Sequence, residues 1–416
     1  MHFIQLILDL GASVMMPLII LILGLVVRMK PIKALRAGLT VGVGFIGINL
    51  ITGTMGGYMT PIIEGLQKQW SLSLDTYDMG WPVSSGIAFS NGQFVVMMFI
   101  VLIAVNLLML SIKATDTLNV DIWNFWHFIM GGSLVYVLTD NIIMGCIAGG
   151  LYGAIVLLLT DKHAERIKDF LGYPGITITT QSFPLTLYVC IWIDKLLDKI
   201  PGINKIKFSL SSLNPQIAFL GEPLFLGFIL GFILPLISNL GIETALSTGV
   251  GMASVMFILP RMVKILMEGL SPLSTAAQEY MSKKFPGRKI NIGMDLAVLL
   301  GDKEIITLSM LMVPITLLLA VVLPGNKVLP FTDLPALTYF MTAPVIAAKR
   351  NSFRSLLIGI IVIISMLYIA TDLAPLFTSI GHSSGLVDAD ATSVSALSSG
   401  GEVIAWIIVK IVSLFS

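Results

Sequence analysis

Long apolar stretches separated by short polar segments recur along the whole chain. The stretches that are long enough, or nearly so, to cross about 30 Å of hydrocarbon are residues 3–27, 37–55, 92–112, 124–138, 141–160, 216–238, 245–260, 304–323, 334–347, 353–371 and 402–416. Inside lipid, each segment must satisfy its own backbone hydrogen bonds, which a helix does. The pattern therefore predicts an all-α polytopic membrane protein with about 11 transmembrane helices.

The composition supports a lipid environment and excludes several other classes of protein. Of the 416 residues, 56% are hydrophobic and only 12% are charged, whereas soluble domains contain about a quarter charged residues. The formal net charge of +1 gives no sign of a nucleic-acid partner. The two cysteines, Cys146 and Cys190, fit neither a disulfide framework nor a metal site. We therefore expect a protein in contact with membrane lipid, without a metal or another cofactor.

Lysine and arginine lie almost entirely in alternate loops between the predicted spans. One set of alternate loops holds nearly all of the 25 basic residues, and the other set holds only Lys68 and Lys327. Because basic residues gather in cytoplasmic loops, the pattern predicts an external N-terminus and a cytoplasmic C-terminus. The segment 372–402 contains acidic residues but no lysine or arginine, and its many Ser, Gly and Thr residues suit a flexible external loop.

The two halves of the chain show weak internal similarity at a nearly constant spacing. Three short pairs match, namely 34–38 with 245–249, 119–122 with 331–334, and 160–161 with 371–372. Five spans in each half and a connector that stays inside give the halves opposite orientations. Transporters use such inverted repeats and bind substrate between them.

This similarity predicts four parts. They are a first five-helix repeat at 1–160, a cytoplasmic connector at 161–215, a second five-helix repeat at 216–372, and an external loop with the last transmembrane helix at 373–416. Within the connector, the apolar segment 183–197 is short and ends near Asp194 and Lys195. We expect it to form an amphipathic helix on the inner membrane surface.

Each half also contains a short apolar piece that cannot cross the membrane. Near 79–89 the chain reads Met-Gly-Trp-Pro-Val-Ser-Ser-Gly, and near 291–303 it includes Gly-Met-Asp-Leu-Ala-Val-Leu-Leu-Gly. Irregular backbone at membrane depth must be buried in protein or line a water-filled cavity. We expect two re-entrant hairpins that enter from opposite faces; the alternative is a pair of ordinary loops with apolar patches.

Polar side chains in or beside these apolar segments are candidates for a binding site. They are Asp121, Asn124 and His127 around the start of the fourth span, Glu222 in the sixth, Asp295 in the second hairpin, Thr180 and Gln181 in the connector, and Ser84 and Ser85 in the first hairpin. A neutral imidazole offers one donor and one acceptor, and a carboxylate offers two acceptor oxygens. Such groups suit the vicinal hydroxyls of a sugar or sugar alcohol.

Several of these residues also have a purely structural interpretation. His127 could bond another helix rather than a ligand, and Glu222 could be a solvated residue favoured by the dipole at a helix start. The polar run 177–182 could be a surface loop. The spacing shows neither a nucleophile–base pair nor a metal-ligand set, which argues against a membrane enzyme without a transport role.

The sequence resembles the galactitol family of membrane subunits, the IIC components, of the phosphoenolpyruvate-driven phosphotransferase system. The motifs that carry the resemblance, spread over nearly the whole chain, are 8–11, 78–82, 119–124, 199–208, 221–223, 256–261 and 322–331. The resemblance implies a fold shared with the ascorbate transporters, which are homodimers with inverted repeats and an elevator motion. The first, second, sixth and seventh spans would form a static scaffold, and the other spans and both hairpins a mobile core that carries the sugar.

The resemblance also implies a function in the bacterial cytoplasmic membrane. Galactitol or a close sugar would be translocated and phosphorylated by a phosphocysteine on a separate cytoplasmic IIB protein, which depends in turn on IIA. No catalytic residue is then expected on this chain, and His127, Asp295, Thr180 and Gln181 would face the sugar. The run Thr179–Ser182 departs from the Pro-His-Gly-Thr-like run of the family, a difference that bears on which polyol is transported.

An ion-coupled secondary transporter is the alternative function. In such a protein Asp9, Asp121, Glu222 or Asp295 would bind the coupling ion or proton. The chemical form of the accumulated solute distinguishes the two functions, because only the phosphotransferase system delivers a phosphate ester.

Overall fold

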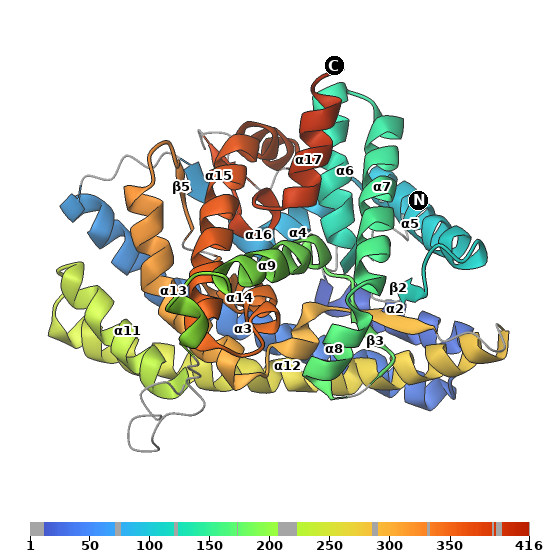
Figure 1. Cartoon of the computed structure of the whole chain (residues 1–416), viewed down its shortest axis with the longest axis horizontal. Coiled ribbons are helices and arrows are strands. Elements are labelled where there is room, and N and C mark those ends of the chain that lie inside the picture. Colours follow the sequence, from blue (N-terminus) through green and yellow to red (C-terminus); the bar gives the residue numbers. More distant parts are fainter. Residues whose placement is uncertain are drawn as a thin grey trace.

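The computed structural model describes residues 12–70, 76–119, 124–172, 174–206, 223–284, 290–330, 333–384, 387 and 393–415, most of them helical (Figure 1). The α-helices are α2 (Ala12–Val26), α3 (Pro31–Trp70), α4 (Gly80–Ser90), α5 (Gly92–Ser111), α6 (Phe125–Thr139), α7 (Ile142–Asp161), α8 (Ala164–Leu171), α9 (Phe183–Leu197), α11 (Pro223–Ile237), α12 (Ile242–Lys284), α13 (Lys303–Val322), α14 (Leu337–Ala347), α15 (Ser352–Ser384), α16 (Leu397–Gly400) and α17 (Val403–Val412). Short 3-10 helices are η2 (Ile203–Lys205), η5 (Leu296–Leu299) and η6 (Leu334–Ala336). The prediction of a largely helical protein is confirmed.

Several of these helices are apolar enough for a membrane. Within the described residues, four helices are long and apolar enough to cross it, namely α5, α7, α13 and α15. Shorter apolar helices are α6, α14, α17 and part of α11. Only segments whose backbone is satisfied internally can lie in hydrocarbon, so this set of helices identifies a multi-pass membrane protein.

Three helices are longer than the apolar segments that predict them. The segments 37–55, 245–260 and 353–371 lie within helices of 40, 43 and 33 residues. At 1.5 Å per residue, a helix of that length exceeds the roughly 30 Å of hydrocarbon. Polar residues beyond an apolar segment continue the helix because Glu, Gln and Lys favour it. The segment 372–402 was expected to be a flexible loop, but its first part, up to Ser384, is helical and belongs to α15.

At the positions of the two expected hairpins, the structure has a strand followed by a short helical segment. In the first half, β1 (Thr76–Asp78) leads into α4, and Asn91 then separates α4 from α5. The Asn91 side chain accepts the backbone N–H of Phe94 at 3.1 Å. In the second half, β4 (Asn291–Met294) leads through Asp295 into η5. Polar caps thus satisfy backbone groups at these breaks.

The elements form two groups that Figure 1 shows one above the other. The lower group consists of α2, α3, α11 and α12, which pack on one another. The upper group touches it through β4 and η5, which pack on α12, and through α13, which packs on α11. One apolar cluster joins the groups, with Ile20, Val41 and Leu273 from the lower group against Ile292 and Met294 from the upper.

Two small parallel sheets tie the halves of the chain together within the described residues. In one, β1 lies between β5 (Val328–Leu329) and β6 (Val394–Ser395). In the other, β4 lies between β2 (Thr117–Asn119) and β3 (Ile176–Ile178). Each central strand comes from one half and both of its neighbours from the other. The sequence analysis did not anticipate these sheets, because strands of two to four residues are too short to show a periodic pattern.

Two buried aspartates organise the first of these sheets. Asp78, at the end of β1, accepts the backbone N–H of Gly80 at 3.1 Å and that of Asp333 at 2.8 Å. The Asp333 carboxylate accepts the backbone N–H of Trp81 at 2.8 Å and that of Ser398 at 2.7 Å. The carboxylates therefore hold the starts of α4, η6 and α16 together.

Replacing Asp333 with Ala is expected to lower the free energy of unfolding by about 2 kcal/mol. Two buried N–H groups would lose their acceptor at about 1–3 kcal/mol each, and relief of repulsion with Asp78 would offset part of that loss. Thermal unfolding of the purified protein in detergent measures the change. Asp169→Ala is the control, because Asp169 is exposed on α8. Equal effects of the two substitutions would contradict a stabilising role of the Asp333 carboxylate.

Candidate functional site

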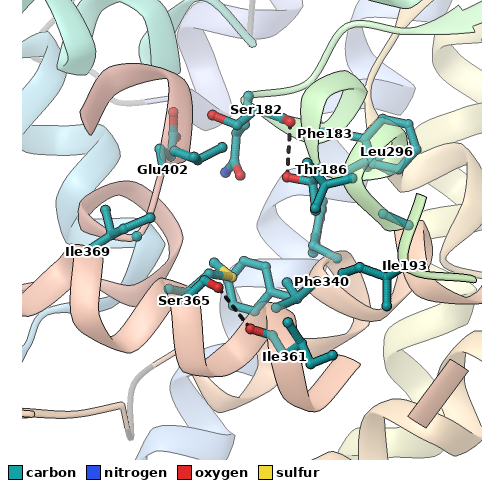
Figure 2. Close-up of a pocket in the computed structure, with 18 residues that line it drawn as sticks. Ser182, Phe183, Thr186, Ile193, Leu296, Phe340, Ile361, Ser365, Ile369 and Glu402 are labelled. Carbon is teal, nitrogen blue, oxygen red and sulfur yellow. Dashed lines mark hydrogen bonds between the residues drawn. The ribbon is translucent and has the colours of Figure 1, made fainter. Parts of the chain in front are cut away.

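A cavity of about 140 Å³ lies between α9, α14, α15 and α17. Its polar wall includes Gln181 and Ser182 just before α9 and Glu402 just before α17. Figure 2 shows Ser182 and Glu402 at one end of the cavity and Ile361 towards the other. A mostly apolar wall with a few convergent polar groups is the usual form of a small-molecule site.

Glu402 is a buried carboxylate with two side-chain partners. It is 2% exposed and precedes the first residue of α17. His127 of α6 lies with its Nδ1 atom 3.1 Å from Glu402 Oε1, and the hydroxyl of Tyr152 of α7 donates to Glu402 Oε2. A carboxylate with four lone-pair positions still has acceptor capacity after these two bonds. Glu402 can therefore offer an acceptor to a molecule in the cavity.

Ser182 extends this network to the other polar wall. Its hydroxyl lies 3.0 Å from that of Tyr152 and accepts the backbone N–H of Ile404 at 3.1 Å. Thr186, one turn into α9, donates to the Ser182 carbonyl at 3.1 Å. The starts of α9 and α17 are thereby fixed to each other and to α7.

A second buried network surrounds Asp295. Its Oδ1 atom accepts the backbone N–H of Ala297 at 2.7 Å, and its Oδ2 atom accepts the hydroxyl of Thr180 at 3.2 Å. Thr180 in turn accepts the Leu296 backbone N–H at 2.8 Å and the Asn124 side-chain amide at 3.2 Å. Asp295 is 7% exposed and Thr180 is 1% exposed. Two predicted site residues that are far apart in sequence are thus brought into contact.

Gln181 lies in the sequence between one residue of each network. It lies between Thr180 and Ser182 and lines the cavity itself, and its φ of 49° is in the left-handed region that few residues adopt. Leu296, next to Asp295, also lines the cavity. The Asp295 network therefore lies directly behind the cavity wall. The Oδ1 atom of Asn124 is buried and has no hydrogen-bond partner among the described residues.

The structure separates the remaining candidates from this cavity or leaves them out. Ser84 and Ser85 lie on α4 and are buried, but they are not among the residues that line the cavity. The Ser84 hydroxyl donates to the Gly80 carbonyl of its own helix at 2.7 Å. Asp121 and Glu222 lie outside the described residues.

Three residues of the network were missed in the sequence analysis, namely Glu402, Tyr152 and Ser182. Glu402 was counted only as an acidic residue of an external loop. Its position at the start of the last apolar span was the available signal, because a carboxylate at membrane depth must have partners. Tyr152 and Ser182 gave no comparable signal, since aromatic and hydroxyl residues are common in apolar helices and loops.

The described residues offer no metal site and no exposed thiol. None of their His, Cys, Asp and Glu side chains forms a group of three that could hold a metal ion. Cys146 and Cys190 are free and buried, and Cys190 is fully enclosed in an apolar cluster. Neither thiol is placed to exchange a phosphoryl group with a partner protein.

Comparison with known proteins places the chain in a family of permeases. Residues 6–390 match the family described as the PTS system sugar-specific permease component. The chain is 34% identical over 407 residues to the "PTS system galactitol-specific EIIC component" of Escherichia coli (strain K12), covering 98% of this chain and 90% of that one. It is 33% identical over 409 residues to a "Putative permease IIC component" of the same organism, with 98% and 93% covered. The chain therefore belongs to the galactitol family of sugar-specific permease components of the phosphotransferase system.

Proposed function

We propose that this protein carries a sugar alcohol, galactitol or a close sugar, across the bacterial cytoplasmic membrane and that a phosphorylated IIB partner phosphorylates it. The observation that carries the proposal is the cavity with Gln181, Ser182 and Glu402 on its wall and Asp295 behind it. A relative that is 34% identical is named galactitol-specific. The phosphoryl donor would be a phosphocysteine on IIB, itself supplied through IIA, because the cysteines of the described chain are buried.

The chemistry of the wall supports a polyhydroxy ligand. Each hydroxyl of a polyol is both a donor and an acceptor. Glu402 offers acceptors, and the Gln181 amide offers both functions. Gln181 and Ser182 belong to the run that departs from the family pattern, so this wall is also where a difference in polyol specificity would arise.

We further propose that the protein works as a homodimer of inverted repeats with an elevator motion. The order of elements supports a repeat. Helix α5 begins at Gly92 and α13 at Lys303, a spacing that matches that of the paired sequence segments, and both helices are 20 residues long. The two sheets support it as well, since each takes its central strand from the opposite half. The group of α2, α3, α11 and α12 would be the scaffold at the dimer contact. In the membrane, the protein would have its N-terminus outside and its C-terminus in the cytoplasm.

Uptake by sealed vesicles tests the function. Purified protein is reconstituted, radiolabelled galactitol is added outside, and phosphorylated IIB is enclosed inside or omitted. We expect galactitol phosphate inside only when the phosphorylated donor is present, because phosphorylation accompanies delivery. Vesicles without the permease are the control for leakage. Accumulation of free galactitol under an ion gradient alone would overturn the proposal in favour of the ion-coupled transporter.

A further inference from the structure

The described wall of the cavity contains a carboxylate but no cationic side chain. Of the 18 residues that line it, Glu402 is the one acidic residue, and there is no lysine, arginine or histidine among them. Figure 2 shows Glu402 at the end of the cavity next to Ser182. Proteins bind phosphate groups with arginine, lysine or free backbone N–H groups. The described wall therefore lacks the cations that such binding uses.

Glu402 is fixed in this position by its partners. His127 Nδ1 lies 3.1 Å from one of its oxygens, and the Tyr152 hydroxyl donates to the other. All three side chains are at most 3% exposed. They come from α6, α7 and the start of α17, so the carboxylate cannot swing away without breaking contacts to two other helices. A solute in the cavity must accommodate Glu402 where it is.

The carboxylate discriminates between the two forms of the solute. A neutral hydroxyl can donate to it, whereas a phosphate monoester carries a charge of about −1.5 to −2 at neutral pH. Like charges that face each other at close range in a poorly solvated site reduce affinity strongly. The two forms differ by only this group, so a carboxylate in the wall distinguishes the solute before phosphorylation from the solute after it.

We propose that Glu402 makes the cavity selective for the neutral polyol and excludes its phosphate ester. This inference rests on the proposed function and deepens it, because it assigns a means of product release. Phosphoryl transfer breaks the sulfur–phosphorus bond of the donor and forms the new oxygen–phosphorus bond, and the proton of the polyol hydroxyl passes to the released cysteine thiolate. The solute is then an anion and leaves the cavity. The ester does not rebind, so transport proceeds in one direction.

Competition binding tests the inference on the purified full-length chain. Radiolabelled galactitol is displaced either by unlabelled galactitol or by galactitol phosphate. We expect the ester to compete at least about 100-fold more weakly than galactitol with the wild-type protein. In Glu402→Gln, which keeps the shape but removes the charge, that ratio should fall at least about 10-fold. Glu165→Gln is the matched control: it removes the same charge from α8, where the Glu165 side chain is 82% exposed, and should leave the ratio unchanged.

A neutral ester separates charge from size and needs no variant. The dimethyl triester of galactitol phosphate is larger than the monoester but uncharged. If the wild-type protein binds the triester and rejects the monoester, charge is the cause, even if Glu402→Gln fails to fold. Rejection of both would assign the selectivity to size and overturn the inference, as would an unchanged ratio in folded Glu402→Gln. Absence of galactitol binding by the wild-type protein would instead overturn the proposed substrate.

Discussion

Asp295→Asn is expected to weaken galactitol binding about 100-fold while leaving the protein folded. Asp295 uses Oδ1 to cap Ala297 at 2.7 Å and Oδ2 to accept the Thr180 hydroxyl at 3.2 Å. Asparagine keeps one carbonyl oxygen, which can still cap Ala297. Its NH₂ group then faces Thr180, whose oxygen already accepts two N–H groups. The acceptor behind the cavity wall is lost and the position of Thr180 is no longer fixed.

The size of this effect follows from the charge of the group. Hydrogen bonds to charged groups contribute about 1.5–3 kcal/mol, and 1.4 kcal/mol corresponds to a factor of ten in affinity. Losing the charged bond that fixes Thr180, and with it the position of the neighbouring wall residue Gln181, gives the expected factor. Equilibrium binding of radiolabelled galactitol in detergent measures it, with Asp169→Asn on the exposed surface of α8 as control. Wild-type affinity in a folded Asp295→Asn protein would remove Asp295 from the site.

Apolar length was a reliable guide to the helices that lie wholly within apolar sequence. The segments 92–112, 141–160 and 304–323 match α5, α7 and α13 to within one residue at each end. Two of these helices, α7 and α13, begin where the apolar sequence begins, directly after Asn141 and Asp302, whose side chains cap them. Where a helix continues through polar sequence, as α12 does, hydropathy gives no signal for its end.

The candidate site could be predicted only in part, because its contacts join distant positions. Thr180 and Asp295 were both predicted as site residues, and they are in contact across 115 positions. His127 was left open between a ligand contact and an internal bond; it forms the internal bond to Glu402, 275 positions away. No local pattern encodes such a pair. The apolar wall of the cavity was likewise not predictable, because its residues have the same sequence pattern as residues of the hydrophobic core.

His127→Ala is expected to destabilise the protein by about 3–5 kcal/mol. The substitution leaves Glu402 buried with only one of its two partners, and an uncompensated buried charge carries a cost of this size. Thermal unfolding in detergent should show a fall in Tm on the order of 10 °C. Thr139→Ala on the same helix is the control, because the Thr139 hydroxyl donates only to the Val135 carbonyl of its own turn, and it should change Tm little.

A double variant shows why His127→Ala loses stability. The cause is either the uncompensated charge of Glu402 or the missing packing of the His127 side chain. In His127→Ala/Glu402→Gln the buried group is neutral, so much of the stability lost in His127→Ala should return. Residues in direct contact give non-additive effects of this kind, of about 0.5–3 kcal/mol. Strict additivity would contradict a coupled pair and would mean that His127 stabilises α6 by packing alone. Recovery would establish that the bond between α6 and α17 holds the Glu402 carboxylate at the cavity, where a neutral polyol can donate to it.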